Sequence, residues 1–215
     1  MADKNMDDYS GPFDPGLRYE NLSKEALVKL LREWGIAVQL VTRAILTAVY
    51  LKYGPEAMEE LAIEEWRGAS PIYTERIRRA LNIKDNDVPA ILKSLQLDPG
   101  FVHQFHDTRY EVVDDKRGFF EVNHCGALVD VEPMGEENVV RVCHPVEDAT
   151  FVATMRAVNP KASTRAVHRP PRKRADETPV CRWEVWIDED AEPGGEAPIT
   201  QITRKMSAAK FEFDP

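Results

Sequence analysis

Cysteine is scarce in this sequence, with three residues in a chain of 215. Three thiols cannot all pair with one another, so a framework of disulfide bonds is excluded. In a reducing compartment thiols serve instead as nucleophiles, metal ligands or small core residues. The start of the chain, MADKNMDDYSGPFDPG, lacks a basic segment followed by an apolar run and so does not resemble a secretory signal. We therefore expect a cytoplasmic protein.

The chain also lacks an excess of positive charge and has no apolar run near the ~20 residues that cross a bilayer. Its formal net charge is -9, and the acidic residues are spread along the sequence. An acidic surface repels the phosphates of nucleic acids and of anionic lipids. We therefore expect neither nucleic acid nor a membrane as a partner.

Helical periodicity dominates the first half of the sequence. Residues 1–20 are polar and contain glycine and proline, which predicts a flexible arm. Apolar residues then recur at helical spacing over 27–53, after Ser23 as N-cap and before a Gly-Pro pair that ends the helix. A long helix with apolar residues on more than one face must bury them, so we expect that it can join two copies of the chain.

Three shorter helices follow in this half. One is predicted over 55–66, and a second runs from Ser70 as N-cap, with Pro71 in the first turn, to about residue 81. The third covers 87–95. The pattern changes after residues 98–100, Asp-Pro-Gly, where alternation of apolar and polar residues replaces helical spacing.

The second half is predicted to be a sheet. The strand candidates are 108–115 and 118–125 as a hairpin, then 127–132, 137–142, 163–168 and 180–187. One further helix is predicted over 145–158. Helices followed by strands indicate an α+β fold in which the helical half packs on an antiparallel sheet. We expect one domain over 21–188, helical over 21–97 and sheet-rich over 101–188, with 189–215 as loop and tail and 199–206 as a candidate edge strand.

All three cysteines and all five histidines lie between His103 and Cys181, within the half predicted to be a sheet. Each cysteine stands at the beginning or end of a predicted element, which is where a rigid scaffold presents side chains to a pocket. A pair such as His103 and His106 would suit a metal only if the segment were helical. The clustering therefore predicts one site built from several elements.

The stretch VCHPVEDATF predicts a thiol at a helix N-terminus, because Pro145 suits a first helical turn. There Cys143, next to His144, would have a stabilised thiolate that can attack an electrophile or bind a metal. Glu147 or Asp148 would orient a histidine, but adjacent helical residues point about 100° apart, so only one of the two faces the pocket. The alternative is that both carboxylates stabilise the helix dipole and the thiol is core.

The remaining candidates come from other elements. Cys125 and His124 end a predicted strand, and Cys181 begins one whose alternation places it on the same face as Trp183. Cys125 can equally be a core residue at the strand end, and for Cys181 core packing against Trp183 is the favoured interpretation. His124 and Trp183 are candidate substrate contacts.

The segment HRPPR, residues 168–172, predicts an anion site stiffened by two prolines. Arg169 and Arg172 would hold a carboxylate bidentately, and His168 would act as general base. The alternative is a solvated basic loop.

A metal site is a further alternative. Zinc takes cysteine and histidine in tetrahedral sets, with Cys125, Cys143, His144 and Cys181 as the candidate ligands. No CxxC pair is present, however, so each ligand would have to come from a separate element.

The order of these motifs resembles a known family. A long helical half, His124-Cys125-Gly126, the Cys143 to Asp148 motif and a terminal strand with Cys181 and Trp183 are similar to the bacterial L-2-amino-thiazoline-4-carboxylic acid hydrolase group, over roughly residues 27–188. That resemblance implies an α+β domain that opens a C–N bond in a small heterocycle or related compound.

Two functions follow as hypotheses. The first is a small-molecule hydrolase that needs no cofactor, in which Cys143 or Cys125 attacks a carbon, His144 or His168 moves protons, and an arginine holds a carboxylate-bearing substrate. The second is a sensor or carrier domain that binds zinc or a small ligand in the same pocket without turnover.

Overall fold

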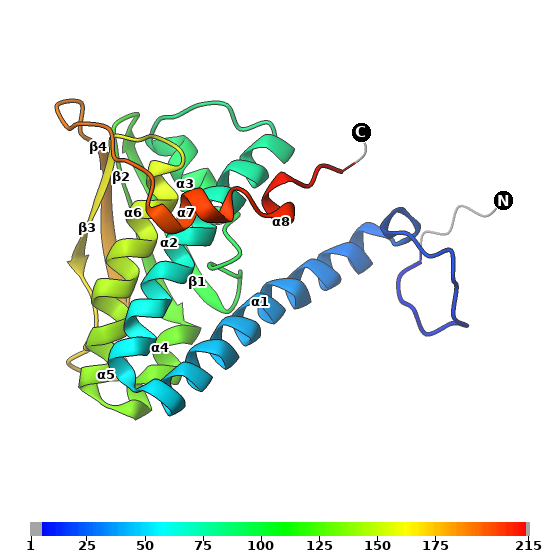
Figure 1. Ribbon diagram of the computed structural model, residues 1–215, viewed down its shortest axis with the longest axis horizontal. Coiled ribbons are helices and arrows are strands. Elements are labelled where there is room, and N and C mark those ends of the chain that lie inside the picture. The colour runs from blue at the N-terminus through cyan, green and yellow to red at the C-terminus, as the bar shows by residue number, and fades with distance from the viewer. Residues whose placement is uncertain (1–5, 214–215) are drawn as a thin grey trace.

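The structure is a computed structural model that describes residues 6–213. Three helices come first: α1 (Lys24–Tyr53), α2 (Pro55–Ala80) and α3 (Val88–Gln96). A four-stranded sheet follows, with further helices around it (Figure 1). The predicted α+β class is therefore confirmed. The predicted arm, residues 1–20, lies partly outside the described residues, and its remainder contains a short 3-10 turn at Tyr19–Asn21.

The bounds of α1 follow from local chemistry. The hydroxyl of Ser23 accepts a hydrogen bond from the backbone N–H of Ala26 at 3.2 Å, which caps the helix as predicted. At the other end Gly54 adopts φ +91°, a left-handed conformation that glycine reaches at little cost, and Pro55 opens α2. The C-terminal half of α1 lies against the body of the protein, whereas its N-terminal half extends away from it (Figure 1).

The expectation that no stretch is long and apolar enough to cross a bilayer is wrong for α1. By length and composition this helix could span a membrane, and little of its apolar stretch is buried. The only charged side chain between Trp34 and Leu51 is Arg43, which forms an ion pair with Asp130. The other charged residues of α1 lie towards its two ends.

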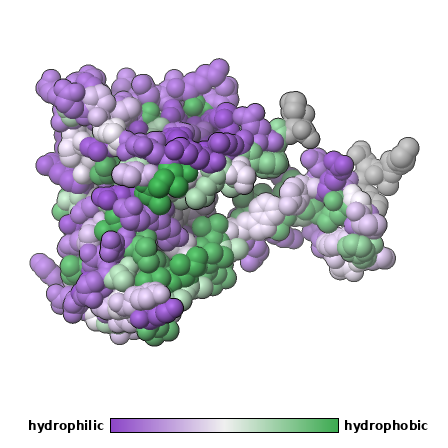
Figure 2. Space-filling view, viewed as in Figure 1, coloured by the Kyte–Doolittle hydropathy of each residue, from purple (hydrophilic) through white to green (hydrophobic). Residues whose placement is uncertain are grey.

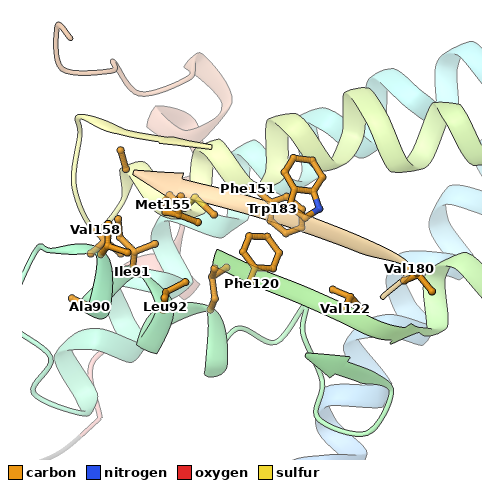
Figure 3. Close-up of a cluster of buried hydrophobic side chains, with 14 of the residues drawn as sticks. Ala90, Ile91, Leu92, Phe120, Val122, Phe151, Met155, Val158, Val180 and Trp183 are labelled. Atoms are coloured by element: carbon orange, nitrogen blue, oxygen red, sulfur yellow. The ribbon is translucent and has the colours of Figure 1, made fainter. Parts of the chain in front are cut away.

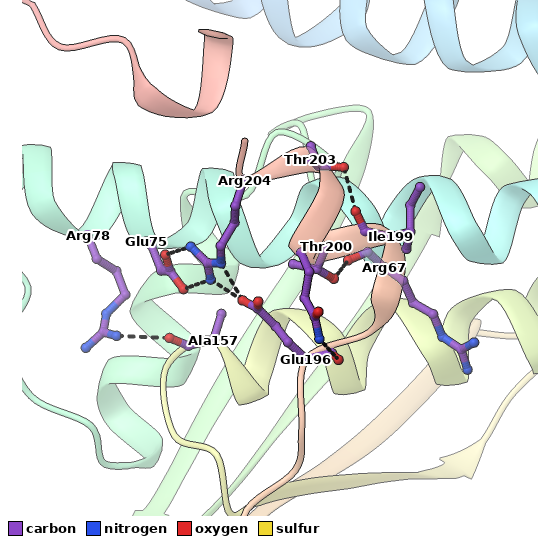
Figure 4. Close-up of polar contacts among 10 residues, drawn as sticks. Arg67, Glu75, Arg78, Ala157, Glu196, Ile199, Thr200, Thr203 and Arg204 are labelled. Atoms are coloured by element: carbon purple, nitrogen blue, oxygen red, sulfur yellow. Dashed lines mark hydrogen bonds and ion pairs between the residues drawn. The ribbon is translucent and has the colours of Figure 1, made fainter. Parts of the chain in front are cut away.

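A predicted helix start at Ser70 is also wrong, because α2 continues through Pro71. A proline inside a helix leaves the carbonyl four residues earlier without its usual donor. Here that carbonyl belongs to Arg67, and the hydroxyl of Thr200 donates to it at 2.7 Å (Figure 4). A residue distant in sequence thus supplies the hydrogen bond that the Arg67 carbonyl loses to Pro71, and α2 continues past the proline.

The segment predicted as loop and tail, 189–215, contains the helix that supplies Thr200. It holds α7 (Pro198–Thr203) and α8 (Ser207–Lys210), so the candidate edge strand over 199–206 is wrong. Arg204 forms ion pairs with both Glu75 of α2 and Glu196 (Figure 4). Residues 214 and 215 lie outside the described part of the chain.

The sheet has the order β1-β2-β4-β3, and every neighbouring pair is antiparallel. Its strands confirm four of the predicted segments. They are β1 (His106–Asp114) and β2 (Arg117–Cys125), which form the hairpin, and β3 (Ala162–His168) and β4 (Cys181–Ile187).

Alternation along β4 separates an apolar face from a charged one. Trp183 and Val185 are buried, whereas Arg182 pairs with Glu111 and Glu121 on the opposite face. On that same face Glu184 pairs with Arg117 and Arg165, so cross-strand ion pairs cover it.

The core lies between the apolar face of the sheet and the helices. Phe151 contributes an edge-to-face ring contact to Trp183, with centroids 4.7 Å apart, and another to Phe120 at 5.0 Å (Figure 3). Residues of α3, including Ile91 and Leu92, extend the same cluster. The core thereby fixes the inner face of β2 and β4 relative to the helix that carries Phe151.

Two predicted strands are helices instead. Segment 127–132 lies in α4 (Gly126–Val131) and a 3-10 turn at Glu132–Met134, and segment 137–142 forms α5 (Glu136–Arg141) and the residue after it. Valine-rich sequences favour strands by local preference, but here each segment buries one apolar side chain, Leu128 or Val139, in the core. Tertiary packing therefore outweighs local preference.

The helix predicted over 145–158 has no separate start. From Glu136 to Arg156 the chain is helical throughout, as α5, a π-helical turn at Val142–Val146 (η3) and α6 (Glu147–Arg156). Pro145 lies inside the π-helical turn. Cys143 and His144 are therefore in the middle of a helical segment, and the N-terminal dipole predicted for them is absent.

Candidate functional site

A cavity of about 420 Å³ lies between α1, α2, the π-helical turn and the apolar face of the sheet. Apolar and aromatic side chains form most of its wall. They include Leu46 and Tyr50 of α1, Met58 and Trp66 of α2, and Phe101 and Phe151 near the core. A space of this size and character is typical of small-molecule sites.

All three cysteines line this cavity, each from a different element. Cys125 ends β2 and caps α4, where its sulfur accepts a hydrogen bond from the N–H of Leu128 at 3.4 Å. Cys143 comes from the π-helical turn and Cys181 begins β4. π-helical turns are rare and often occur at functional sites. The fold thus brings together three thiols that are well separated in sequence.

The surroundings of the three thiols keep them protonated. Burial raises the pKa of Cys125 to about 11 and the pKa of Cys181 to about 12. Burial, and next the nearby Glu147 carboxylate, raise the pKa of Cys143 further still. The predicted low-pKa thiolate at Cys143 is therefore wrong, because that residue is half-buried in the middle of a helical segment instead of standing at the positive end of a helix.

Glu147 is the acidic group of the cavity that lacks a protein partner. Within residues 6–213 its carboxyl has no hydrogen bond or ion pair. Burial, and then the charges of Asp98 and Asp148, raise its pKa to about 7. An unpaired carboxyl in an apolar wall is costly unless a ligand or water completes its hydrogen bonds.

Asp98 lines the same cavity but is well satisfied. Its carboxylate accepts hydrogen bonds from the hydroxyl of Tyr73 at 3.0 and 3.1 Å and from the N–H of Gly100 at 2.6 Å. Burial raises its pKa to about 6, against the lowering effect of those hydrogen bonds. Asp98 is thus a fixed structural acid, whereas Glu147 is free to interact with a ligand.

His106 and Arg43 supply the basic side of the cavity. Burial and then the Arg43 charge lower the pKa of His106 to about 4, so its ring is neutral, and its Nδ1 atom has no hydrogen-bond partner. Arg43 lies over the ring of Phe105 at 5.0 Å while paired with Asp130. The sequence offered only the His103-His106 spacing for this histidine, and His103 bonds the carbonyl of Gln96 outside the cavity.

The adjacent carboxylates Glu147 and Asp148 point to different surroundings, as helical geometry predicts. Glu147 lines the cavity, whereas Asp148 forms a 2.7 Å ion pair with Arg169. Arg169 reaches the cavity and lies over the ring of Trp183 at 5.7 Å, so Trp183 forms part of the wall. Arg172 is outside, bound by two oxygens of Glu132. The predicted pair of arginines free to hold a carboxylate is therefore absent.

Three histidines proposed from the sequence do not line the cavity. The Nε2 atom of His144 lies 2.8 Å from the carbonyl oxygen of Pro170, and that of His168 lies 2.8 Å from the carbonyl of Pro179. His124 is exposed on β2. These placements remove His144 and His168 as proton carriers for the cavity thiols and His124 as a substrate contact.

The described residues contain no group of three or more His, Cys, Asp or Glu side chains arranged to hold a metal ion. Of the four ligands considered for zinc, His144 is turned to the Pro170 carbonyl, which separates it from the three cysteines. The cysteines thus meet at one cavity without forming a tetrahedral set.

Asp98 and two threonines of α6 at the cavity, Thr150 and Thr154, were not predicted from the sequence, and His106 was considered only as a weak metal ligand. Asp98 stands next to Pro99-Gly100, which signals only a turn. The helix spacing of Glu147, Thr150 and Thr154, three and then four residues apart, was the one available signal for a polar stripe.

The fold and cavity define an α+β protein with a mainly apolar, ligand-sized site that opens to solvent. Residues 20–187 match the model described as Family of unknown function (DUF6125), and the chain belongs to that family. No curated protein matches the sequence, and no solved structure matches it either. The resemblance to L-2-amino-thiazoline-4-carboxylic acid hydrolases has no support from these comparisons and stays a prediction.

Proposed function

We propose that this protein binds a small, mainly apolar organic molecule that carries one hydrogen-bond donor, preferably a protonated amine. The observation that carries the proposal is Glu147, an unpartnered carboxyl in the wall of a 420 Å³ cavity lined largely by apolar side chains. The apolar wall would hold the body of the ligand and Glu147 would orient its polar end.

The charges around the cavity favour an amine over an acid. Arg43 is neutralised by Asp130 and Arg169 by Asp148, so the basic groups at the wall already have partners. Asp98 is satisfied by Tyr73 and Gly100. An amine would supply the missing donor for Glu147, and the ion pair would draw the carboxyl into its charged form.

A matched series of probes tests this proposal: 4-phenylbutylamine, 4-phenylbutanol and 4-phenylbutyrate, which share one apolar body. Affinity is measured by calorimetry at pH 8 with the wild type, Glu147→Gln and Asp148→Asn. We expect the amine to bind wild type roughly 10- to 100-fold more tightly than the alcohol, a charge-assisted hydrogen bond being the difference. Glu147→Gln should remove that preference. Asp148→Asn leaves Glu147 in place but frees Arg169, so it should weaken the preference less and raise the affinity of 4-phenylbutyrate.

Two results would contradict the proposal. Tighter binding of 4-phenylbutyrate than of the amine would return Arg169 to the carboxylate-binding role predicted from the sequence. Absence of binding for all three probes would mean that the cavity does not take ligands of this class.

A second candidate function is hydrolysis of a C–N bond, as the sequence predicts. It is favoured by the pKa of Glu147, which is raised to about 7 by burial and nearby carboxylates and lies close to working pH. The Cys143 thiol would pass its proton to Glu147 as sulfur adds to a C=O or C=N carbon. Glu147 would return the proton to the leaving nitrogen, and water would then cleave the thioester or thioimidate.

Mass spectrometry distinguishes turnover from binding alone. A protein incubated with a small amide or thiazoline and quenched in acid would carry a covalent adduct on one cysteine if this candidate is correct. Separate Cys125→Ser, Cys143→Ser and Cys181→Ser variants identify the residue. Full activity of all three variants on a turned-over substrate rules out covalent catalysis.

A further inference from the structure

Six apolar side chains form a continuous line along α1, spaced alternately four and three residues apart. All are exposed to solvent, with exposed fractions between 37% and 68%. We call this line the α1 seam. Its members are Leu27, Leu31, Trp34, Val38, Val41 and Ile45.

The spacing is the heptad pattern by which two helices pair. Alternating steps of four and three residues keep one stripe facing a partner helix over successive turns, and here the stripe continues for almost three heptads of a 30-residue helix about 45 Å long. A helix that packs only on its own domain needs no such regular second stripe.

The seam lies on a different side of α1 from the residues that hold the helix to its own body. Gln39 donates to the carbonyl oxygen of Gly100, Arg43 pairs with Asp130, and Leu46 packs against the small cluster around Met58. At 100° per residue, these three contacts centre well over 90° away from the seam around the helix axis. Thr42, which donates to Glu65, and Val49, which packs against the same cluster, lie nearer to the seam on that side. The seam is therefore open to a partner while α1 remains docked, apart from an edge-to-face contact of Tyr19 with the Trp34 ring at 5.3 Å.

The residues beside the seam favour burial against a partner, because none of them is charged. The positions that flank it are uncharged: Val28, Leu30, Gly35, Ala37, Thr42, Ala44, Val49 and Leu51. Figure 2 shows hydrophobic residues gathered on the lower part of the body, where α1 joins it. Monomeric proteins rarely expose contiguous apolar surface of this extent.

We propose that a second copy of this chain covers the seam, so that the protein is a homodimer joined through α1. A stripe of this kind is self-complementary, as a two-fold axis requires. Covering the six side chains on both copies removes roughly 1,100 Å² from water, close to the ~1,200 Å² at the low end of stable interfaces, and the flanking side chains add more. The proposal does not depend on what the cavity binds.

Two neighbouring residues provide a matched test. Val41 belongs to the seam and is 60% exposed, whereas Leu40 is 63% exposed but lies about 100° away from it. The full chain, Val41→Glu and Leu40→Glu are compared by sedimentation equilibrium over a concentration series. We expect the wild type to have twice the mass of one chain, Val41→Glu to weaken the dimer at least about 100-fold because it buries two like charges, and Leu40→Glu to leave it intact.

Circular dichroism of both variants shows whether each keeps its helices, and Leu31→Glu repeats the seam test at an independent position. A wild type that stays monomeric at about 100 μM overturns the proposal, as does equal weakening by Leu40→Glu. Neutral and anionic vesicles are included in a flotation assay. A monomer that floats with vesicles through the seam would assign this surface to a membrane and also overturn the proposal.

Discussion

Glu147 of α6, which is half-buried, and Asp98 of the connector after α3, which is buried, place two carboxyl groups in the wall of one cavity. Burial raises both pKa values, and the charge of Asp98 raises that of Glu147 further, to about 7. The two acids therefore cannot both ionise cheaply, and the one without hydrogen bonds, Glu147, carries the larger penalty.

This relationship predicts that stability falls as pH rises. The unfolded chain loses the Glu147 proton near its ordinary pKa of 4.5, whereas the folded protein holds it until about 7. Stability from this group is thus fully present below pH 4.5, is lost progressively up to pH 7, and amounts to roughly 3 kcal/mol as an upper limit. Urea unfolding of the wild type and Glu147→Gln at pH 5 and pH 8 measures it.

We expect Glu147→Gln to be the more stable protein at pH 8 and to lose much of the pH dependence. A smaller dependence of the same sign should remain, because Asp98 also has a raised pKa. The Asp148→Asn variant should reduce the slope less than Glu147→Gln does, because the Asp148 charge is the smallest of the three causes that raise the Glu147 pKa. An unchanged slope in Glu147→Gln would show that this carboxyl ionises normally.

The thiols should react slowly in the folded protein. With its pKa raised to about 11 by burial, only about one Cys125 in a thousand is thiolate at pH 8. A disulfide reagent such as DTNB should therefore modify the native protein much more slowly than free cysteine, and modify all three thiols rapidly in guanidinium. One rapidly reacting thiol under native conditions would contradict this and favour the hydrolase candidate.

The hydroxyl of Thr200 should contribute measurably to stability, because it satisfies the Arg67 carbonyl that Pro71 cannot reach. Thr200→Val keeps the shape and removes the donor, and we expect it to cost about 1–2 kcal/mol in urea unfolding. Thr203→Val removes a hydroxyl that bonds within its own helix, to Ile199. That control should cost less than about 0.5 kcal/mol, and equal losses would contradict the assignment.

Gly118 is required by a close approach between β2 and its neighbours. A Cβ atom there would lie 2.8 Å from the carbonyl oxygen of Glu111 and 2.9 Å from a methyl group of Val88. Gly118→Ala should therefore cost about 1–3 kcal/mol by overpacking. Gly195→Ala, where nothing lies within 4 Å, should change thermal unfolding little.

The strands were predictable where one chain segment carries its own alternation. In β4, Trp183 and Val185 face the core, while Arg182 and Glu184 lie on the opposite face in cross-strand ion pairs, so seven residues show the whole alternation. The end of α1 was predictable for a similar reason. Gly54, with its positive φ, and Pro55, which begins α2, end the helix without help from residues distant in sequence.

Features that depend on distant partners were not predictable in this way. Continuation of α2 through Pro71 needs Thr200, which lies 133 residues from the carbonyl it satisfies. Likewise, Asp98 becomes a site residue only because the fold places a turn against α6. The positions of the three cysteines at the ends of predicted elements indicated that they would meet at one site. Their raised pKa values could not be predicted, because these depend on burial in the folded protein.

The π-helical turn at Val142–Val146 sets the rotational phase of everything that follows it in α6. Such a turn holds one residue more than an α-helical turn, and deletion of one residue would rotate α6 by about 100°. Glu147 would then leave the cavity while Phe151 turned away from Trp183. The one additional residue in the π-helical turn therefore sets the orientation of both faces of α6: the face that lines the cavity and the face that packs in the core.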